Sequence, residues 1–187
     1  MASFPGRRRA EARRRAQIEA VERFCVLGWW ERRLTGRLVE TAWPGVMAVA
    51  IPGPIGAVTC IAFSRTPEGG HCYGHAADES IGAACERAIL EMTRHELVVS
   101  HWTEMASSGV SPGSLFERRA LYFSTDAGYC RFRDRLGQAA RDPAPQPVVL
   151  VDREIAGPWS EYGTVWRYAF EPGTERFWTE GDDYFFW

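Results

Sequence analysis

Arginine and glutamate recur at helical spacing in two distant segments of the chain. The first segment carries Arg15, Glu19, Glu22 and Arg23, and the second carries Arg87, Glu91 and Arg94. Steps of three and four residues project such side chains together from a helix. Carboxylate oxygens are ligands that Mg²⁺ prefers, and arginine binds phosphate through two parallel hydrogen bonds. The two rows therefore indicate a site for Mg²⁺ and a phosphorylated ligand, and ion pairing between the helices is the alternative.

Histidine gives weaker patterns for metal binding. The pair His95-Glu96 resembles the start of a zinc-binding helix, but the next histidine, His101, falls on another face of that helix. The group His71, Cys72 and His75 could hold a metal together with a further ligand. On a strand, however, the first two of these side chains point to opposite faces, so we prefer a plain strand end.

Lysine is absent from the chain, because all 22 basic residues are arginine. This excludes a Walker-type phosphate lysine, a Schiff-base lysine and a lysine general base. The motifs G-x-G-x-x-G and G-x-S-x-G are absent as well. A net charge of −2 gives no general basic field, so we expect no nucleic-acid partner.

The sequence predicts neither a membrane protein nor an exported one. The basic N-terminus continues into charged residues instead of an apolar run, so we expect no signal peptide. No apolar run approaches the roughly 20 residues that cross a bilayer. The five cysteines are scattered, odd in number and without a C-x-x-C pair, which is typical of reduced thiols. We therefore expect a cytoplasmic protein without a membrane partner.

Long helices and a sheet are expected to position the charged rows. Sequence periodicity and turn residues predict helices over 8–29, 81–102 and 127–141, a polar loop over 106–113, and strands over 46–51, 56–63, 71–75, 148–152 and 164–170. With 187 residues, 45% of them hydrophobic, the chain is long enough for one core. We expect one α+β domain over residues 1–187, with a single mixed sheet flanked by long helices.

Two apolar patterns predict what these elements bury. In the second helix, one stripe at alternating three- and four-residue steps consists of Ile81, Cys85, Ala88, Met92, His95, Val99 and Trp102. The tail over 173–187 is acidic and aromatic, and its last four residues are all aromatic. Such a group is a liability in solvent, so we expect the tail to pack on this chain or on a partner.

The order of several motifs resembles the YcaO superfamily. The run from Gly6 to Ala12 is similar to that family's G-N-T-x-x-E-A, and a helix with E-x-x-E-R follows at Glu19, Glu22 and Arg23. The segment from Gly74 to Glu91 is similar to its second signature, G-x-x-x-H-x-D-x-x-x-A-x-x-R-A-x-x-E-x-x-Q. The strands expected at 148–152 and 163–172 resemble the family's late V-x-D and G-x-x-V-x-R-x-x-x-P motifs. The matches span nearly the whole chain, and the implied fold is the C-terminal part of a YcaO domain.

The resemblance implies ATP and Mg²⁺ as cofactors and a peptide as substrate. Family members use ATP to activate a peptide-backbone amide by phosphorylation, which yields azolines, thioamides or amidines in ribosomally made peptides. One branch assists methylthiolation of a ribosomal protein. By position, Glu19, Glu22 and Glu91 correspond to ligands of Mg²⁺ and nucleotide, and Arg23 and Arg87 to ligands of phosphate. Arg15 and Arg94 belong to the same rows and complete the predicted cofactor set.

Departures from the family pattern add a partner chain and a second candidate function. Complete members carry an earlier helix of carboxylates that has no counterpart here, so we expect a protein partner or a homo-oligomer to complete the site. Arg94 occupies the position of a family glutamine, and Arg7 and Arg8 replace an asparagine and a threonine. The alternative is therefore a non-catalytic YcaO-like binding or scaffold subunit of a peptide-modifying complex. A third possibility is a fold with ion-paired helices and no nucleotide.

Overall fold

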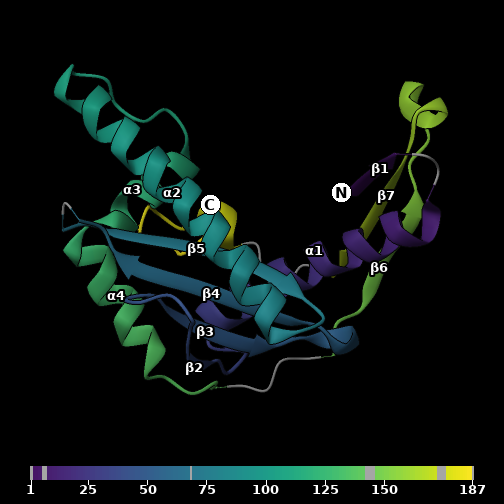
Figure 1. Ribbon diagram of the computed structural model, residues 1–187, viewed down its shortest axis with the longest axis horizontal. Coiled ribbons are helices and arrows are strands. Elements are labelled where there is room, and N and C mark those ends of the chain that lie inside the picture. The colour runs from purple at the N-terminus through teal and green to yellow at the C-terminus, as the bar shows by residue number, and fades with distance from the viewer. Residues whose placement is uncertain (1, 6–7, 68, 142–145, 172–175, 187) are drawn as a thin grey trace.

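The computed structural model describes residues 2–5, 8–67, 69–141, 146–171 and 176–186, apart from some side chains within them (Figure 1). The helices are α1 (Arg9–Trp30), α2 (Ile81–Ser107), α3 (Leu115–Ser124), α4 (Asp126–Leu136) and α5 (Arg176–Thr179). The strands are β1 (Ala2–Pro5), β2 (Arg37–Glu40), β3 (Met47–Pro52), β4 (Val58–Arg65), β5 (His71–Asp78), β6 (Val149–Glu154) and β7 (Gly163–Phe170). No helix in these ranges is long and apolar enough to cross a membrane.

The α+β class is confirmed, with one correction to the sheet. In place of a single mixed sheet, the described strands form two antiparallel sheets, ordered β2-β3-β4-β5 and β1-β7-β6. Short connections join the strands of the larger sheet one after another, and such connections impose antiparallel pairing. The strand β7 pairs with the N-terminal strand β1 on one side and with β6 on the other, so neither β6 nor β7 extends the larger sheet.

Helices cover both faces of the larger sheet, and the residue alternation of the strands explains which helix covers which face. Small side chains such as Ala48, Ala50, Cys60 and Ala76 face α2. Bulky ones such as Ile51, Ile61 and Tyr73 face α1, α4 and the C-terminal tail. The small side chains let α2 approach closely: a Cβ atom added to Gly74 would lie 2.1 Å from the backbone nitrogen of Met92. This contact fixes the face that α2 turns toward β5.

The predicted buried stripe of α2 is confirmed over its middle and ends where the sheet ends. Cys85, Ala88, Met92 and His95 are buried, whereas the later members of the stripe are partly exposed. Figure 1 shows why, because the C-terminal part of α2 projects beyond the sheet. The helix also runs to Ser107, past its predicted end, so the predicted polar loop begins later in the chain.

The C-terminal tail completes the core on the α1 side of the sheet. Tyr184, Phe185 and Phe186 are at most 6% exposed, which confirms the predicted packing for these three residues, whereas Trp187 lies outside the described residues. The buried guanidinium of Arg119 holds this segment by donating hydrogen bonds to the carbonyl oxygens of Glu180, Gly181 and Phe186. The sequence did not predict α3, which carries this arginine.

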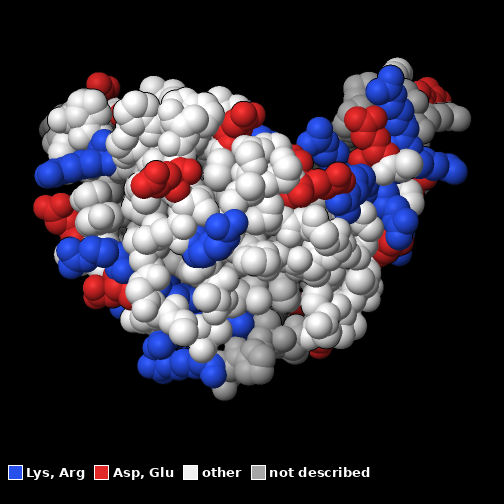
Figure 2. Space-filling model, turned by 60° about the horizontal axis from the view of Figure 1, so that its bottom comes forward, with Lys and Arg blue, Asp and Glu red and all other residues white. Residues whose placement is uncertain are grey.

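The smaller sheet lies against α1 at the other end of the molecule (Figure 1). Arg13 of α1 forms a two-pronged hydrogen bond and ion pair with Asp152 of β6, and the indole of Trp166 donates to the same carboxylate at 2.8 Å. Arg13 and Trp166 hold the pKa of Asp152 below its usual range, chiefly through the arginine hydrogen bond. The exterior here is rich in charge of both signs (Figure 2).

Candidate functional site

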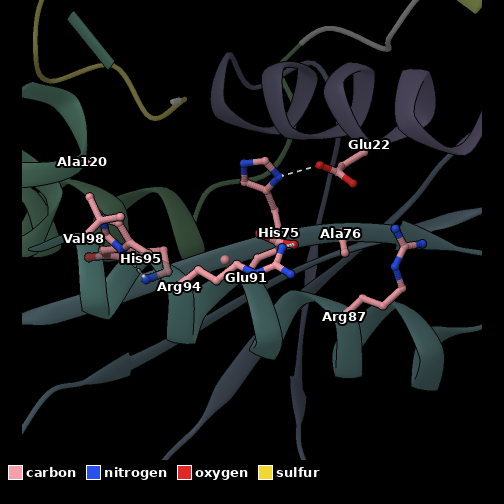
Figure 3. Close-up of a pocket in the computed structure, with 11 residues that line it drawn as sticks. Glu22, His75, Ala76, Arg87, Glu91, Arg94, His95, Val98 and Ala120 are labelled. Carbon is pink, nitrogen blue, oxygen red and sulfur yellow. Dashed lines mark hydrogen bonds and ion pairs between the residues drawn. The ribbon is translucent and has the colours of Figure 1, made fainter. Parts of the chain in front are cut away.

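A cavity of about 300 Å³ opens between α1, the edge of β5 and α2 (Figure 3). It is lined by Glu22, Tyr73, Gly74, His75, Ala76, Arg87, Glu91, Arg94, His95, Val98 and Ala120. Four of the seven predicted cofactor residues are therefore in one place. Glu22 comes from α1, and Arg87, Glu91 and Arg94 come from α2. The convergence follows from the layers, because the two helices lie on opposite faces of β5 and β5 is the last strand of its sheet.

Glu22 binds β5 through both of its carboxylate oxygens. Oε1 lies 2.9 Å from Nδ1 of His75, and Oε2 accepts a hydrogen bond from the backbone N–H of Ala77 at 3.3 Å. The two side chains are each about one-fifth exposed, so water screens their interaction only in part. The imidazole of His75 also stacks on Phe186, with ring centroids 5.8 Å apart. Glu22 therefore holds the histidine through Nδ1, and the C-terminal tail packs on the imidazole ring.

The arginines and the glutamate of α2 form two further polar contacts at the cavity. Arg87 donates to the backbone carbonyl of Ala77 at 2.9 Å and to the carboxylate of Asp78 at 3.2 Å. Arg94 pairs with Glu91 three residues earlier, at 2.5 Å, and both of these side chains are largely exposed. Exposed pairs of this kind contribute little stability and separate readily when a ligand competes for either charge.

His95 closes one end of the cavity as a buried, neutral group. Its Nδ1 accepts a hydrogen bond from the backbone N–H of Tyr73 at 3.1 Å, and the residue is only 6% exposed. Burial lowers its pKa to about 4. Its place in the apolar stripe of α2 predicted the burial, but nothing local in the sequence predicted its bond to β5. His75 was missed as a partner of Glu22 for the same reason.

The other three predicted cofactor residues lie on parts of α1 outside this cavity. Arg15 lines a separate hollow with Asp78 and Glu79. Glu19 pairs with Arg23 at 3.3 Å, four residues along the helix, and the guanidinium of that arginine lies 5.9 Å from the ring centroid of Phe186. Helical spacing places such residues on neighbouring faces, and only the packing of α1 decided that Glu22 turns toward β5.

The predicted metal ligands are only partly brought together. Within the described ranges, no three histidine, cysteine, aspartate or glutamate side chains are grouped as ligands for an ion. The cavity contains two of the three predicted carboxylates, Glu22 and Glu91, without Glu19. The weaker candidate at residues 71–75 is divided as well. His71 lies 3.1 Å from Asp126 and stacks on Tyr129, whereas His75 faces Glu22.

Comparison of the chain with protein-family models, with curated proteins and with solved structures found no match in any of the three.

Proposed function

We propose that the chain is a YcaO-like protein that binds ATP with Mg²⁺ in the cavity between α1 and α2 and acts with a partner chain on a peptide-backbone amide. One observation supports this proposal above the others: Glu22, Arg87, Glu91 and Arg94 line a single cavity although the helices that carry them are far apart in the sequence. Two carboxylates and two guanidinium groups of the predicted rows therefore lie close enough together to bind one ligand.

The donors at this cavity fit a nucleotide-bound Mg²⁺ better than a free ion. Mg²⁺ in nucleotide sites is usually held by one or two carboxylates together with substrate phosphates. The cavity supplies two carboxylates, Glu22 and Glu91, and two guanidinium groups for phosphate oxygens, Arg87 and Arg94. Its volume of about 300 Å³ is at the lower end of the range for ligand pockets, so part of a nucleotide would extend from it. ATP bound there would supply the phosphoryl group.

A second function, that of a non-catalytic binding subunit, is favoured by a different observation. Each of the four charged side chains already has a partner: Glu22 has His75, Arg87 has Asp78, and Glu91 has Arg94. A nucleotide must displace or share these contacts, and two of them attach to β5. Under this alternative the pairs hold the fold together, and the surface around them binds a peptide or another subunit of a peptide-modifying complex.

Isothermal titration with ATP separates the two functions. The full chain is titrated with ATP in the presence and absence of Mg²⁺, alone and with the product of a neighbouring gene. We expect ATP binding that requires Mg²⁺. We also expect the substitution Arg87→Gln to weaken ATP binding about tenfold, because it removes one charge-assisted hydrogen bond to phosphate. Arg118→Gln is the matched control, because Arg118 is equally exposed and paired with Asp182 but lies outside the cavity.

The outcomes assign the function directly. Mg²⁺-dependent binding that Arg87→Gln weakens and Arg118→Gln preserves supports the ATP-dependent function. Absence of ATP binding in every setting contradicts it and favours the binding subunit. Equal loss in both variants would also contradict it, because the effect would then follow from net charge instead of the cavity.

A further inference from the structure

The cavity exposes the free edge of a β-sheet. Among the described strands, β5 is an outer strand of the larger sheet, so one of its edges pairs with none of them. Four successive residues of β5, 73–76, line the cavity. Successive side chains of a strand point to opposite faces. Four consecutive residues can therefore line the same cavity only if the cavity lies along the backbone edge of the strand. Gly74 has no side chain at all, and its backbone forms part of the wall.

Hydrogen bonds on either side show which backbone groups point into the cavity. The N–H of Tyr73 donates to His95, and the N–H and C=O of Ala77 bond to Glu22 and Arg87. These groups therefore point away from β4. In an antiparallel ladder the direction repeats every second residue, so the N–H and C=O of His75 point the same way. No other residue of the described ranges hydrogen-bonds to this pair.

The surroundings restrict what can pair with His75. The backbone of α2 packs against Gly74 on one face of the strand, and Glu22 of α1 binds on the other. The close-up shows β5 lying between the two helices, with its edge toward the cavity (Figure 3). A second folded sheet cannot enter such a space, because it brings its own covering layers. A single extended chain can enter. The C=O and N–H of one of its residues can then form two hydrogen bonds with the N–H and C=O of His75.

We propose that the edge of β5 at His75 binds an extended segment of the peptide substrate by strand addition. Main-chain hydrogen bonds supply the affinity in this mode of recognition, and alternate side chains of the peptide contact the walls. Here one set of side chains faces Glu22 and Phe186, and the other faces Arg87, Glu91 and Arg94. The inference rests on the proposed function, from which it takes the peptide as the substrate.

This placement puts a backbone amide of the peptide beside the groups proposed to bind phosphate. The two hydrogen bonds to His75 fix the position of one peptide residue, and the amides on either side of that residue enter the same cavity as Arg87 and Arg94. Holding two reactants in one orientation lowers the entropic cost of their reaction. Strand addition would thus position the amide without any sequence-specific pocket.

A binding experiment without nucleotide tests strand addition separately from ATP binding. A pool of capped octapeptides with random sequences is passed over the immobilised full chain, and retained peptides are synthesised individually. Each is titrated into ¹⁵N-labelled protein by NMR. We expect the amide of His75 to shift and to become protected from hydrogen exchange. We also expect N-methylation of the pairing peptide residue to weaken binding at least about tenfold, and N-methylation of its neighbours to have little effect.

Two variants of the protein isolate the backbone N–H. His75→Ala keeps the backbone N–H and removes the imidazole, whereas His75→Pro removes the imidazole and the backbone N–H. Proline is tolerated at an edge strand where the N–H points away from the sheet, so we expect the second variant to fold. Binding of a retained octapeptide is expected to be at least about tenfold weaker for His75→Pro than for His75→Ala. A thermal melt of each variant checks folding, and if the proline variant is unfolded, the N-methylation series decides.

The results distinguish this inference from the proposed function. Retention of no octapeptide overturns strand addition even if ATP binds. Uniform sensitivity to N-methylation, or binding that leaves the His75 amide unprotected, overturns it as well. Sensitivity to N-methylation at a single peptide residue, together with a protected His75 amide, supports strand addition even if the chain binds no ATP, and in that case only the nucleotide part of the proposed function fails.

Discussion

Glu22 on α1 and His75 on β5 lie 2.9 Å apart, and the second oxygen of the same carboxylate accepts from the N–H of Ala77. One side chain therefore attaches the first helix to the outer strand of the sheet. Removing it leaves the imidazole and a backbone N–H without their partner at a partly buried position.

The first prediction concerns this attachment. We expect Glu22→Ala to lower the free energy of unfolding by about 1–2 kcal/mol, since two polar groups lose a hydrogen bond in a partly exposed place. Urea denaturation measures the change. Glu11→Ala is the control on the same helix, because Glu11 forms only an exposed pair with Arg8, and we expect it to change stability by less than about 0.5 kcal/mol. Equal effects of the two substitutions would contradict a special role for Glu22.

The second prediction concerns pH and His95. Burial lowers the pKa of this histidine to about 4, below the value of about 6.5 in an unfolded chain. The unfolded state therefore takes up a proton at a higher pH than the folded state. The resulting stabilisation is complete above pH 6.5 and is lost as the pH falls from about 6.5 to about 4, by up to about 3 kcal/mol.

Urea denaturation at several pH values checks this expectation. His95→Asn should flatten the dependence between pH 6.5 and 4, whereas His101→Asn, at an exposed position, should leave it unchanged. A slope that persists in the His95 variant would assign the pH dependence to other groups.

The third prediction concerns the tail. Arg119 is fully buried and donates to the carbonyls of Glu180, Gly181 and Phe186. We expect Arg119→Ala to cost about 3 kcal/mol, because three buried or partly buried acceptors lose a charged donor, and to expose the tail to protease. Arg118→Ala removes only an exposed pair with Asp182 and should cost less than about 1 kcal/mol. Limited proteolysis with mass spectrometry locates the cleavage. A tail that stays protected in the Arg119 variant contradicts its role.

The fourth prediction concerns the contact between β5 and α2. A Cβ atom at position 74 would lie 2.1 Å from the nitrogen of Met92 and 2.2 Å from the carbonyl oxygen of Ala88, and neither backbone atom can turn aside. We expect Gly74→Ala to destabilise the fold by about 3 kcal/mol through overpacking. Gly82→Ala is the control in α2, where nothing lies within 4 Å, and it should be neutral or stabilising. A thermal melt compares the two variants.

The local pattern of the sequence predicted the three longest described helices, α1, α2 and α4, and the strands β3 to β7. The three- and four-residue steps through Cys85, Ala88 and Met92 predicted α2 and its buried face, and the alternation over 164–170 predicted β7. Such patterns depend on neighbours within one element, which the sequence shows directly. The short strand β2 and the helix α3 contain too few residues with strand alternation or helical three- and four-residue steps to be recognised from the sequence.

The tertiary structure alone decided which charges share a site. Arg15, Glu19 and Glu22 look equivalent along α1, yet only Glu22 lines the cavity, because the packing of α1 on the sheet turns that one position toward β5. The division of the strands between two sheets, the open edge at His75 and the bond from Tyr73 to His95 likewise join residues distant along the chain. The sequence determined the chemistry that the charged rows can offer, and long-range packing, which no local period encodes, decided where that chemistry meets.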